Sequence, residues 1–403
     1  MNHKRQIQHR ILLLIAATSL LVAMSTRMRA DSGTCGGASI TLPFTDVQAS
    51  NIFFCSIAEA YFSGLTNGTS ATTYAPTQPV PREQMAAFVT RTMDQSLKRG
   101  SRRAAMEQWW TPGDTGVLRS VTLSSTPRDI VFDGQDLWVA NMSGSNVSRV
   151  RASDGRVMQT WTGATGAIAV VVAAGKIFIA GNLGGGTQGK IYSINPEAPS
   201  AGAVTLFEPD IGFAPLAITF DGVNLWTANS TGSISRVSVV NGLDSTFTGF
   251  GSPDDILWDG SNLWLADGGD NTLKRVDPSN GTVLESISGF GGANKLLFDG
   301  TNIWVSNFSA NNVMVVRAVG GLRGTVLATI TGNSLDGPYG MAFDGERVLV
   351  CNFNNNSVSL FKAADLTPLG NMSTGANSHP EAARSDGVNF WIVRPTLNDV
   401  VRF

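Results

Sequence analysis

The 403-residue chain has little histidine and few charged side chains. Its three histidines are His3, His9 and His379, too few for a metal site built from several histidines. Charged residues make up 15% of the chain and hydrophobic residues 42%, a balance that excludes long disordered or coiled-coil segments. A surplus of basic charge is also absent. The chain has a net charge of −2, and since residues 1–30 contain five basic and no acidic side chains, the remainder has a net charge of −7. A protein of that sign is not expected to bind nucleic acid.

The only long apolar run lies near the N-terminus. Residues 1–10 are basic, residues 11–24 are apolar, and Ala30 before Asp31 offers a cleavage point. This order is typical of a secretory signal, so we expect residues 1–30 to be removed on export. A retained membrane anchor is the alternative, but the run is shorter than the ~20 residues that span a bilayer. The expected protein is secreted to the cell envelope or cell surface and has no transmembrane segment after cleavage.

Three cysteines follow this leader. In an oxidising compartment, Cys35 and Cys55 can form a disulfide around a loop of about 20 residues, worth roughly 3 kcal/mol through restriction of the unfolded chain. Two unpaired thiols are the alternative. Cys351 occupies a position where other copies of a repeat carry alanine or serine, so we expect it to be a small core residue.

Residues 40–94 show a helical pattern of their own. Apolar residues at helical spacing predict one helix over about 52–65 and a second that begins at Pro81, with Met85 and Val89 on its apolar face. The pattern therefore predicts a small helical hairpin.

Three motifs in this segment resemble an S-layer homology module across residues 41–94. They are FTDV at 44–47, GLTNG at 64–68 and VPREQMA at 80–86. The resemblance implies non-covalent attachment to cell-envelope polysaccharide, with Asp46 and Arg82 as the polymer-binding residues. An arginine can hold a ligand carboxylate through two charge-assisted hydrogen bonds. In the alternative, Asp46 caps a helix and Arg82 pairs with Glu83 or Glu59.

After a linker at 95–115, a short motif recurs seven times. It is a turn followed by an apolar strand, as in FDGVNLWTAN at 220–229. The turns begin at residues 133, 174, 221, 259, 299, 344 and 386. Four short strands at a period of about 42 residues are typical of propeller blades. We predict a mainly β fold, in which a small N-terminal α-helical module precedes a seven-bladed β-propeller over residues 116–403.

Tryptophan recurs on the second strand of five copies, and Phe178 and Leu349 take its place in the other two. Such residues can bury a large apolar area against the neighbouring blade, so we expect them in the core. The seventh copy lacks an outer strand, and residues 116–123 have the pattern of one. We predict that 116–123 completes the last blade and closes the ring. The region resembles the seven-bladed propellers of the NHL and YVTN repeat families, whose members include lyases, lactonases and scaffolds.

Propellers bind at one face, near the central channel, where the loops that lead into the inner strands converge. The ligand-binding candidates at these positions are Arg128, Asp254, Asp255, Lys295, Tyr339, His379 and Glu381. A water-filled channel mouth with satisfied charges is the alternative. Adjacent side chains on a strand point to opposite faces, so Asp254 and Asp255 cannot share one ion. The sequence supports no metal and no cofactor.

These patterns together favour an exported envelope protein. Its module attaches to cell-wall or surface polysaccharide, and its propeller is a binding platform for a protein or small ligand. The competing hypothesis is a secreted propeller lyase or hydrolase that the module tethers. The streptogramin-inactivating enzymes, which the propeller also resembles, use histidine with acidic residues and a divalent metal, and only His379 and Glu381 can play that part here. A purely structural surface protein is the third hypothesis.

Overall fold

The computed structural model of the chain describes residues 32–35, 38–62, 65–99, 119–182 and 187–403. It divides into two compact units, Met1–Gln95 and Ser96–Phe403. The expected leader at 1–30 lies outside the described residues, as does most of the expected linker. Within the described residues, no helix is both long enough and apolar enough to cross a membrane.

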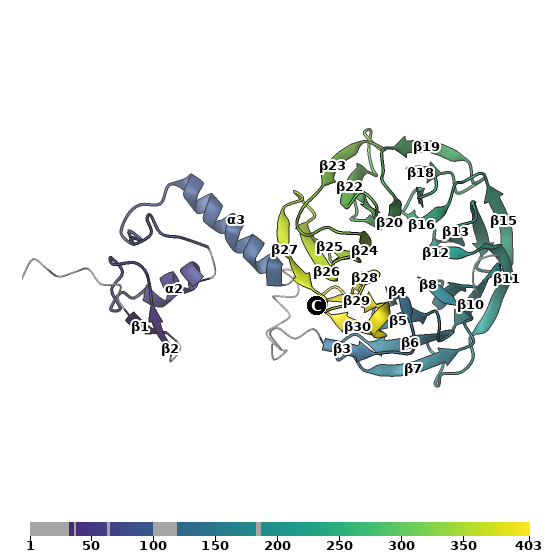
Figure 1. Cartoon of the computed structure of the whole chain (residues 1–403), viewed down its shortest axis with the longest axis horizontal. Helices are drawn as coiled ribbons and strands as arrows, with labels where there is room; N and C mark the ends of the chain where they lie inside the picture. Colours follow the sequence, from purple (N-terminus) through teal and green to yellow (C-terminus); the bar gives the residue numbers. More distant parts are fainter. Residues whose placement is uncertain (1–31, 36–37, 63–64, 100–118, 183–186) are drawn as a thin grey trace, which may run out of the picture. The chain divides into compact units, whose positions relative to one another are not determined.

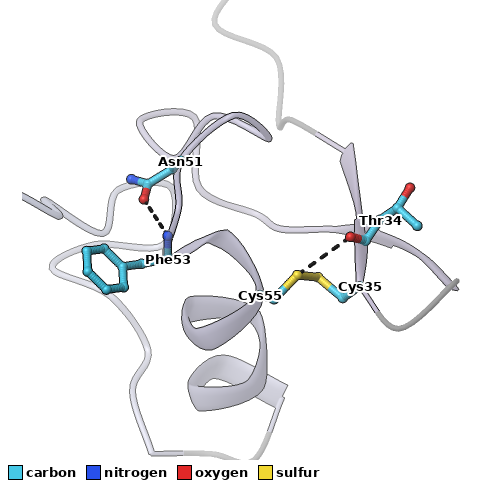
Figure 2. The surroundings of a disulfide bond; sticks show 5 residues. All are labelled: Thr34, Cys35, Asn51, Phe53 and Cys55. Carbon is cyan, nitrogen blue, oxygen red and sulfur yellow. Dashed lines mark hydrogen bonds between the residues drawn. A yellow bond between two sulfur atoms is a disulfide. The ribbon is translucent and has the colours of Figure 1, made fainter.

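The first unit contains a two-stranded antiparallel sheet and two helices. They are β1 (Ser32–Cys35), β2 (Ala38–Thr41), α2 (Phe54–Phe62) and α3 (Arg82–Arg99). Its core consists of Leu42, Phe44, Val47, Phe54, Ile57 and Ala58. A disulfide between Cys35 and Cys55 joins β1 to the start of α2 (Figure 2).

This unit differs from the predicted helical hairpin. The small sheet was not expected, and Ile52 lies before α2 with 87% of its surface exposed. The apolar face expected on α3 is not buried either, because Met85 and Val89 are each about half exposed. The core is filled by residues on α2 and before it, so α3 is not needed to cover it. Helix α3 also continues to Arg99, so the helix extends into the expected linker.

The second unit is a seven-bladed β-propeller, as predicted. Seven four-stranded antiparallel sheets surround a central axis, with the first strand of each sheet near the axis and the last at the rim (Figure 1). In blades 1 to 4 the strands are β4 (Pro127–Phe132), β5 (Asp136–Asn141), β6 (Asn146–Arg151) and β7 (Val157–Thr162); β8 (Ala167–Ala173), β9 (Lys176–Gly181), β10 (Gln188–Ile194) and β11 (Thr205–Phe213); β12 (Pro215–Phe220), β13 (Asn224–Asn229), β14 (Ser233–Ser238) and β15 (Gly242–Thr248); β16 (Pro253–Trp258), β17 (Leu263–Asp267), β18 (Thr272–Val276) and β19 (Val283–Ser288). In blades 5 to 7 they are β20 (Ala293–Phe298), β21 (Asn302–Asn307), β22 (Asn312–Arg317) and β23 (Val326–Ile330); β24 (Pro338–Phe343), β25 (Arg347–Asn352), β26 (Ser357–Lys362) and β27 (Pro368–Ser373); β28 (Ala382–Ser385), β29 (Phe390–Arg394), β30 (Asp399–Arg402) and β3 (Arg119–Thr122).

The last blade contains both ends of the propeller. Strand β3 pairs with β30 in antiparallel register, from Arg119 opposite Arg402 to Thr122 opposite Asp399. The Ser120 hydroxyl donates a hydrogen bond of 2.5 Å to the Asp399 carboxylate. The outer strand missing from the seventh copy is therefore supplied from within the 116–123 segment.

Each recurrent tryptophan is buried and fixed by an aspartate five residues before it. The indole Nε1 donates to the aspartate Oδ2 over 2.7–2.8 Å in the pairs 138/133, 226/221, 264/259, 304/299 and 391/386. All five tryptophans are completely buried. Each packs on the next blade, as Trp264 of blade 4 does on Leu296 and Val305 of blade 5. The prediction that these residues form the core is confirmed.

Of the two blades without tryptophan, one lacks the aspartate and the other keeps it. In blade 2 Phe178 takes the indole position, and Ala174 occupies the turn in place of an aspartate. Blade 6 has Leu349 at the indole position and keeps Asp344, where Arg347 Nε replaces the indole as donor at 2.7 Å. The carboxylate is thus present only in blades that give it a side-chain donor.

A second set of hydrogen bonds joins neighbouring blades. Asparagines in the left-handed backbone region precede the third strands of blades 4 to 7, at 271, 311, 356 and 398 with φ of 52–58°. Their Oδ1 atoms accept from backbone N–H groups of the following blade, at Gly292, Gly337, His379 and Thr126. Asparagine suits this position because it tolerates the left-handed conformation better than most residues.

We predict energetic coupling between Trp264 and Asp259. Trp264→Ala should lower the free energy of unfolding by about 3–5 kcal/mol through loss of packing. Trp264→Phe combined with Asp259→Ala gives blade 4 the residues that blade 2 has at these positions, Phe178 and Ala174. This double variant should lose about 1 kcal/mol less than the sum of the two single variants, because either single change already removes the hydrogen bond between the indole and the carboxylate.

The measurement is equilibrium unfolding of the full chain in guanidinium chloride. Asp277→Ala is the control for the second substitution, because Asp277 also bonds its own turn, at Ser279, but no indole. Its combination with Trp264→Phe should be additive. Additive losses for the Asp259 pair as well would contradict the coupling.

Candidate functional site

The inner strands of all seven blades enclose a central cavity of about 440 Å³. Six of the seven propeller residues expected at the channel line it: Arg128, Asp254, Asp255, Lys295, Tyr339 and Glu381. The seventh, His379, does not. Three further charged or amide-bearing residues of the lining were not among the candidates: Asp129, Asn294 and Arg384.

Two of the lining carboxylates fasten blades to each other. Asp129 on β4 accepts from the N–H of Val170 on β8 at 2.9 Å, and Asp255 on β16 accepts from the N–H of Leu296 on β20 at 2.8 Å. Burial raises the pKa of both carboxyl groups. A signal for Asp129 was present in the sequence, because the two aspartates share the pattern Pro-X-Asp-Ile at 127–130 and 253–256.

Asp254 faces a different partner from its neighbour Asp255. Its carboxylate lies against Gly268 at the end of β17 and leaves no room there for a side chain. Burial raises the pKa of Asp254 to about 6, with Lys295 opposing the shift and Asp255 and Asp267 adding to it. The two adjacent carboxylates therefore do not converge on one point. The described residues also contain no group of three or more side chains arranged to hold a metal ion.

Lys295 lies on β20 within the cavity. Its Nζ donates to the backbone oxygen of Asp254 at 3.3 Å and lies 5.9 Å from the centre of the Tyr339 ring. Burial opposes the charge of the ammonium, but nearby acidic groups, led by Asp255 and including Asp129, outweigh this and raise the pKa of Lys295. The side chain is therefore charged at neutral pH. Burial also raises the pKa of Tyr339, which keeps its hydroxyl protonated.

An ion pair links blade 1 to the start of blade 7. Arg128 Nη1 lies 2.5 Å from both carboxylate oxygens of Glu381. Burial raises the pKa of Glu381, although Arg128 opposes the shift. Arg128 Nε and Asn294 Oδ1 are buried without a hydrogen-bond partner. The lining thus contains polar groups whose bonding capacity the protein does not use.

His379 belongs to a cluster of rings of which only Tyr339 lines the cavity. Its Nδ1 lies 3.0 Å from the Phe353 carbonyl oxygen, and its ring centre is 4.6 Å from that of Phe353. Phe353 also packs on Phe308 and Tyr339, with ring centres 6.0 and 6.2 Å apart. His379 and Glu381 therefore do not face the cavity as a pair, and only Glu381 is placed to meet a ligand there.

The N-terminal candidates have separate surroundings. Asp46 accepts from the N–H groups of Tyr74 and Ala75 at 2.8 and 2.7 Å, so both carboxylate oxygens hold an internal loop rather than a helix end. Arg82 begins α3 and is exposed. Cys351 is buried in the interface between blades 6 and 7, where burial raises the pKa of its thiol.

Comparisons with known proteins identify the propeller alone. No family model and no curated protein sequence matches the chain. Virginiamycin B lyase from Staphylococcus aureus is 15% identical, with 71% of this chain and 98% of that one covered and a TM-score of 0.58. The WD40 propeller domain of Doa1 is 15% identical over 72% and 97% with a TM-score of 0.59. Hydrazine synthase of Kuenenia stuttgartiensis is 18% identical over 73% and 99% with a TM-score of 0.58. These similarities establish a β-propeller fold.

We predict that the Asp254 carboxylate destabilises the folded protein at neutral pH. Its folded pKa of about 6 lies above the ordinary 3.8, so the native state binds more protons between these values. The unfavourable effect is therefore absent below the lower value, grows between the two and is complete above pH 6. Asp254→Asn should be more stable than the wild type by about 1–3 kcal/mol at pH 8, with the difference vanishing towards pH 4.

Urea unfolding of the full chain at several pH values tests this. Asp277→Asn is the matched control with the opposite sign, because hydrogen bonds from Ser279 lower the pKa of Asp277. Relative to the wild type, Asp277→Asn should become less stable as the pH rises through the range where Asp277 ionises. An Asp254→Asn protein less stable than the wild type at pH 8 would show that the carboxylate is stabilising.

Proposed function

We propose that the propeller is a binding module for a small polar molecule held in the central cavity. The observation that carries this proposal is Lys295, a charged ammonium group whose single hydrogen bond is 3.3 Å long. An ammonium can donate three hydrogen bonds, and buried polar groups are normally satisfied. A bound molecule that accepts from Lys295 would complete its bonding.

The remainder of the cavity supports the same function. Its volume of about 440 Å³ lies within the range of ~300–1,000 Å³ common for small-molecule sites. Charged groups enter from several blades, and aliphatic side chains such as Ile168 and Leu216 line the space between them. Apolar walls with a few fixed polar groups are the usual composition of a ligand site.

A secreted propeller lyase or hydrolase is the second candidate. Asp254, with a pKa of about 6, can take up or release a proton near neutral pH, and it lies beside Lys295. Acid–base catalysis through His379 has less support, because its Nδ1 lies against the Phe353 carbonyl and the residue does not line the cavity. We therefore favour binding without turnover.

We further propose that the protein is exported and that its N-terminal unit attaches to cell-envelope polysaccharide. The Cys35–Cys55 disulfide supports an oxidising compartment, in agreement with the leader pattern. The S-layer-like motifs remain a resemblance. Because Asp46 is engaged by the loop at Tyr74 and Ala75, Arg82 is the residue of this pair available for an acidic polymer.

The cavity proposal predicts ligand binding that depends on Lys295. We expect ligand-observed NMR on the full chain to detect a bound member of a library of amino acids, nucleosides, sugars and small carboxylic acids. Lys295→Met should weaken that binding about tenfold or more, because it removes a charged hydrogen-bond donor. Lys176→Met, a change at the exposed first residue of β9, is the matched control. Tyr339→Phe provides a milder second variant in case Lys295→Met does not fold, and equal binding by the variants would place the site elsewhere.

The attachment proposal predicts that Arg82 contributes to envelope binding. Full-length protein should sediment with purified acidic envelope polysaccharide, and Arg82→Ala should weaken the binding about tenfold through loss of a charge-assisted bond. Arg91→Ala removes an equal charge from the exposed surface of the same helix and should leave binding unchanged. If neither the wild type nor the Arg91→Ala control sediments with the polysaccharide, the attachment proposal is refuted.

A further inference from the structure

The residues that line the cavity also indicate the class of its ligand. This inference rests on the proposed binding function. We infer that the cavity binds a neutral sugar, with two neighbouring hydroxyl groups between Asp254 and Lys295. Charge balance, unused hydrogen-bonding capacity and the ring of Tyr339 carry this inference.

The charges that line the cavity nearly cancel. The basic side chains are Arg128, Lys295 and Arg384, and the acidic ones are Asp129, Asp254, Asp255 and Glu381. An anionic ligand would meet four carboxyl groups, and a cationic ligand would meet three cations, so neither gains a clear Coulomb advantage. The Arg128 and Glu381 charges already neutralise each other across 2.5 Å. A neutral ligand avoids the desolvation penalty that a charged one would bring.

Three consecutive inner strands each contribute a polar side chain that makes few or no hydrogen bonds within the described residues. Asp254 on β16, Lys295 on β20 and Tyr339 on β24 form a strip, here called the polar strip. Among the described residues, the Asp254 carboxylate accepts from the backbone N–H of Gly268 but from no side chain. Lys295 Nζ makes its one long bond, and the Tyr339 hydroxyl has no partner in the described part of the chain. The strip therefore presents an acceptor, a donor and a group that can do either.

A pair of adjacent hydroxyl groups matches that order. Each hydroxyl can donate one hydrogen bond and accept others, so one can donate to Asp254 while its neighbour accepts from Lys295. A carboxylic acid would satisfy Lys295 but repel Asp254, and an amine would do the reverse. Adjacent hydroxyls on a ring are the common feature of sugars.

The apolar part of the lining suits the other surface of a sugar ring. The Tyr339 ring borders the cavity and is supported by Phe308 at 6.1 Å between ring centres. Ile168 on β8 and Leu216 on β12 supply apolar surface from the opposite side of the axis (Figure 1). A pyranose has C–H groups on its faces and hydroxyls at its edge, so it can contact both kinds of wall.

The volume limits the ligand to a small one. About 440 Å³ lies in the range of ~300–1,000 Å³ common for small-molecule sites, and it is more than one hexose of twelve non-hydrogen atoms requires. A single sugar ring therefore fits, with space left for water.

The test is calorimetric titration of the full chain at pH 7.5. The probes are D-glucose, D-galactose, D-mannose and N-acetyl-D-glucosamine, with glucuronate and glucosamine as charged analogues and glycine and glutamate as non-sugars. At least one neutral sugar should bind, and charged forms should bind about tenfold more weakly or not at all. Asp254→Asn and Tyr339→Phe should each weaken sugar binding about tenfold, whereas the matched changes Asp277→Asn and Tyr192→Phe should not.

The outcomes separate the ligand class from the existence of the site. Stronger binding of a charged sugar or an amino acid, lost in Lys295→Met, would overturn the sugar and leave the binding function standing. Sugar binding that is unchanged in both Asp254→Asn and Tyr339→Phe would overturn the assignment to the polar strip. Binding of none of the probes overturns the sugar inference, and failure of the wider library as well overturns the binding function.

Discussion

The fold depends on a partly buried carboxylate that is hydrogen bonded to an indole in five of the seven blades. The same aspartate accepts backbone N–H groups of its own turn, as Asp259 does from Ser261 and Asn262. One side chain therefore fixes the turn and holds the ring of Trp264 where it packs against the next blade. A carboxylate without these donors would be unfavourable in this partly buried position. Blade 2 lacks both members of the pair, and in blade 6 Arg347 donates in place of an indole.

This constraint explains why the propeller was predictable and the N-terminal unit was less so. The turn and the apolar strand recur at a fixed spacing in seven copies, and the tryptophan recurs in five of them, so the copies indicate the same local structure independently. The strand at 116–123 was recognisable because the seventh copy lacked a partner for β30. No repetition supports the first unit, and the exposure of Met85 and Val89 depends on tertiary packing that helical spacing alone does not specify.

The site was predictable to the extent that it follows the blade repeat. Six candidates line the cavity because the positions that begin the inner strands converge in any closed ring. Asp129 escaped notice because its role is a bond to the following blade, which no single blade reveals. His379 lies away from the cavity because of two contacts. Its backbone is in the left-handed region and donates from its N–H to Asn356, and its ring packs on Phe353. Both outcomes depend on contacts between residues of adjacent blades.

The strand that completes the ring is also the strand through which the propeller is covalently connected to the preceding chain. Mechanical tension applied along that connection reaches β3 first. There it is resisted by the ladder with β30, the Ser120–Asp399 bond, the backbone bond from Leu123 to Asn398 and the packing of Val121 in the core between blades 7 and 1. A pulling force applied through the preceding chain would consequently separate β3 from β30 in blade 7 before it strained the other six blades. This short ladder is thus the part of the propeller with the least mechanical resistance to force from that side.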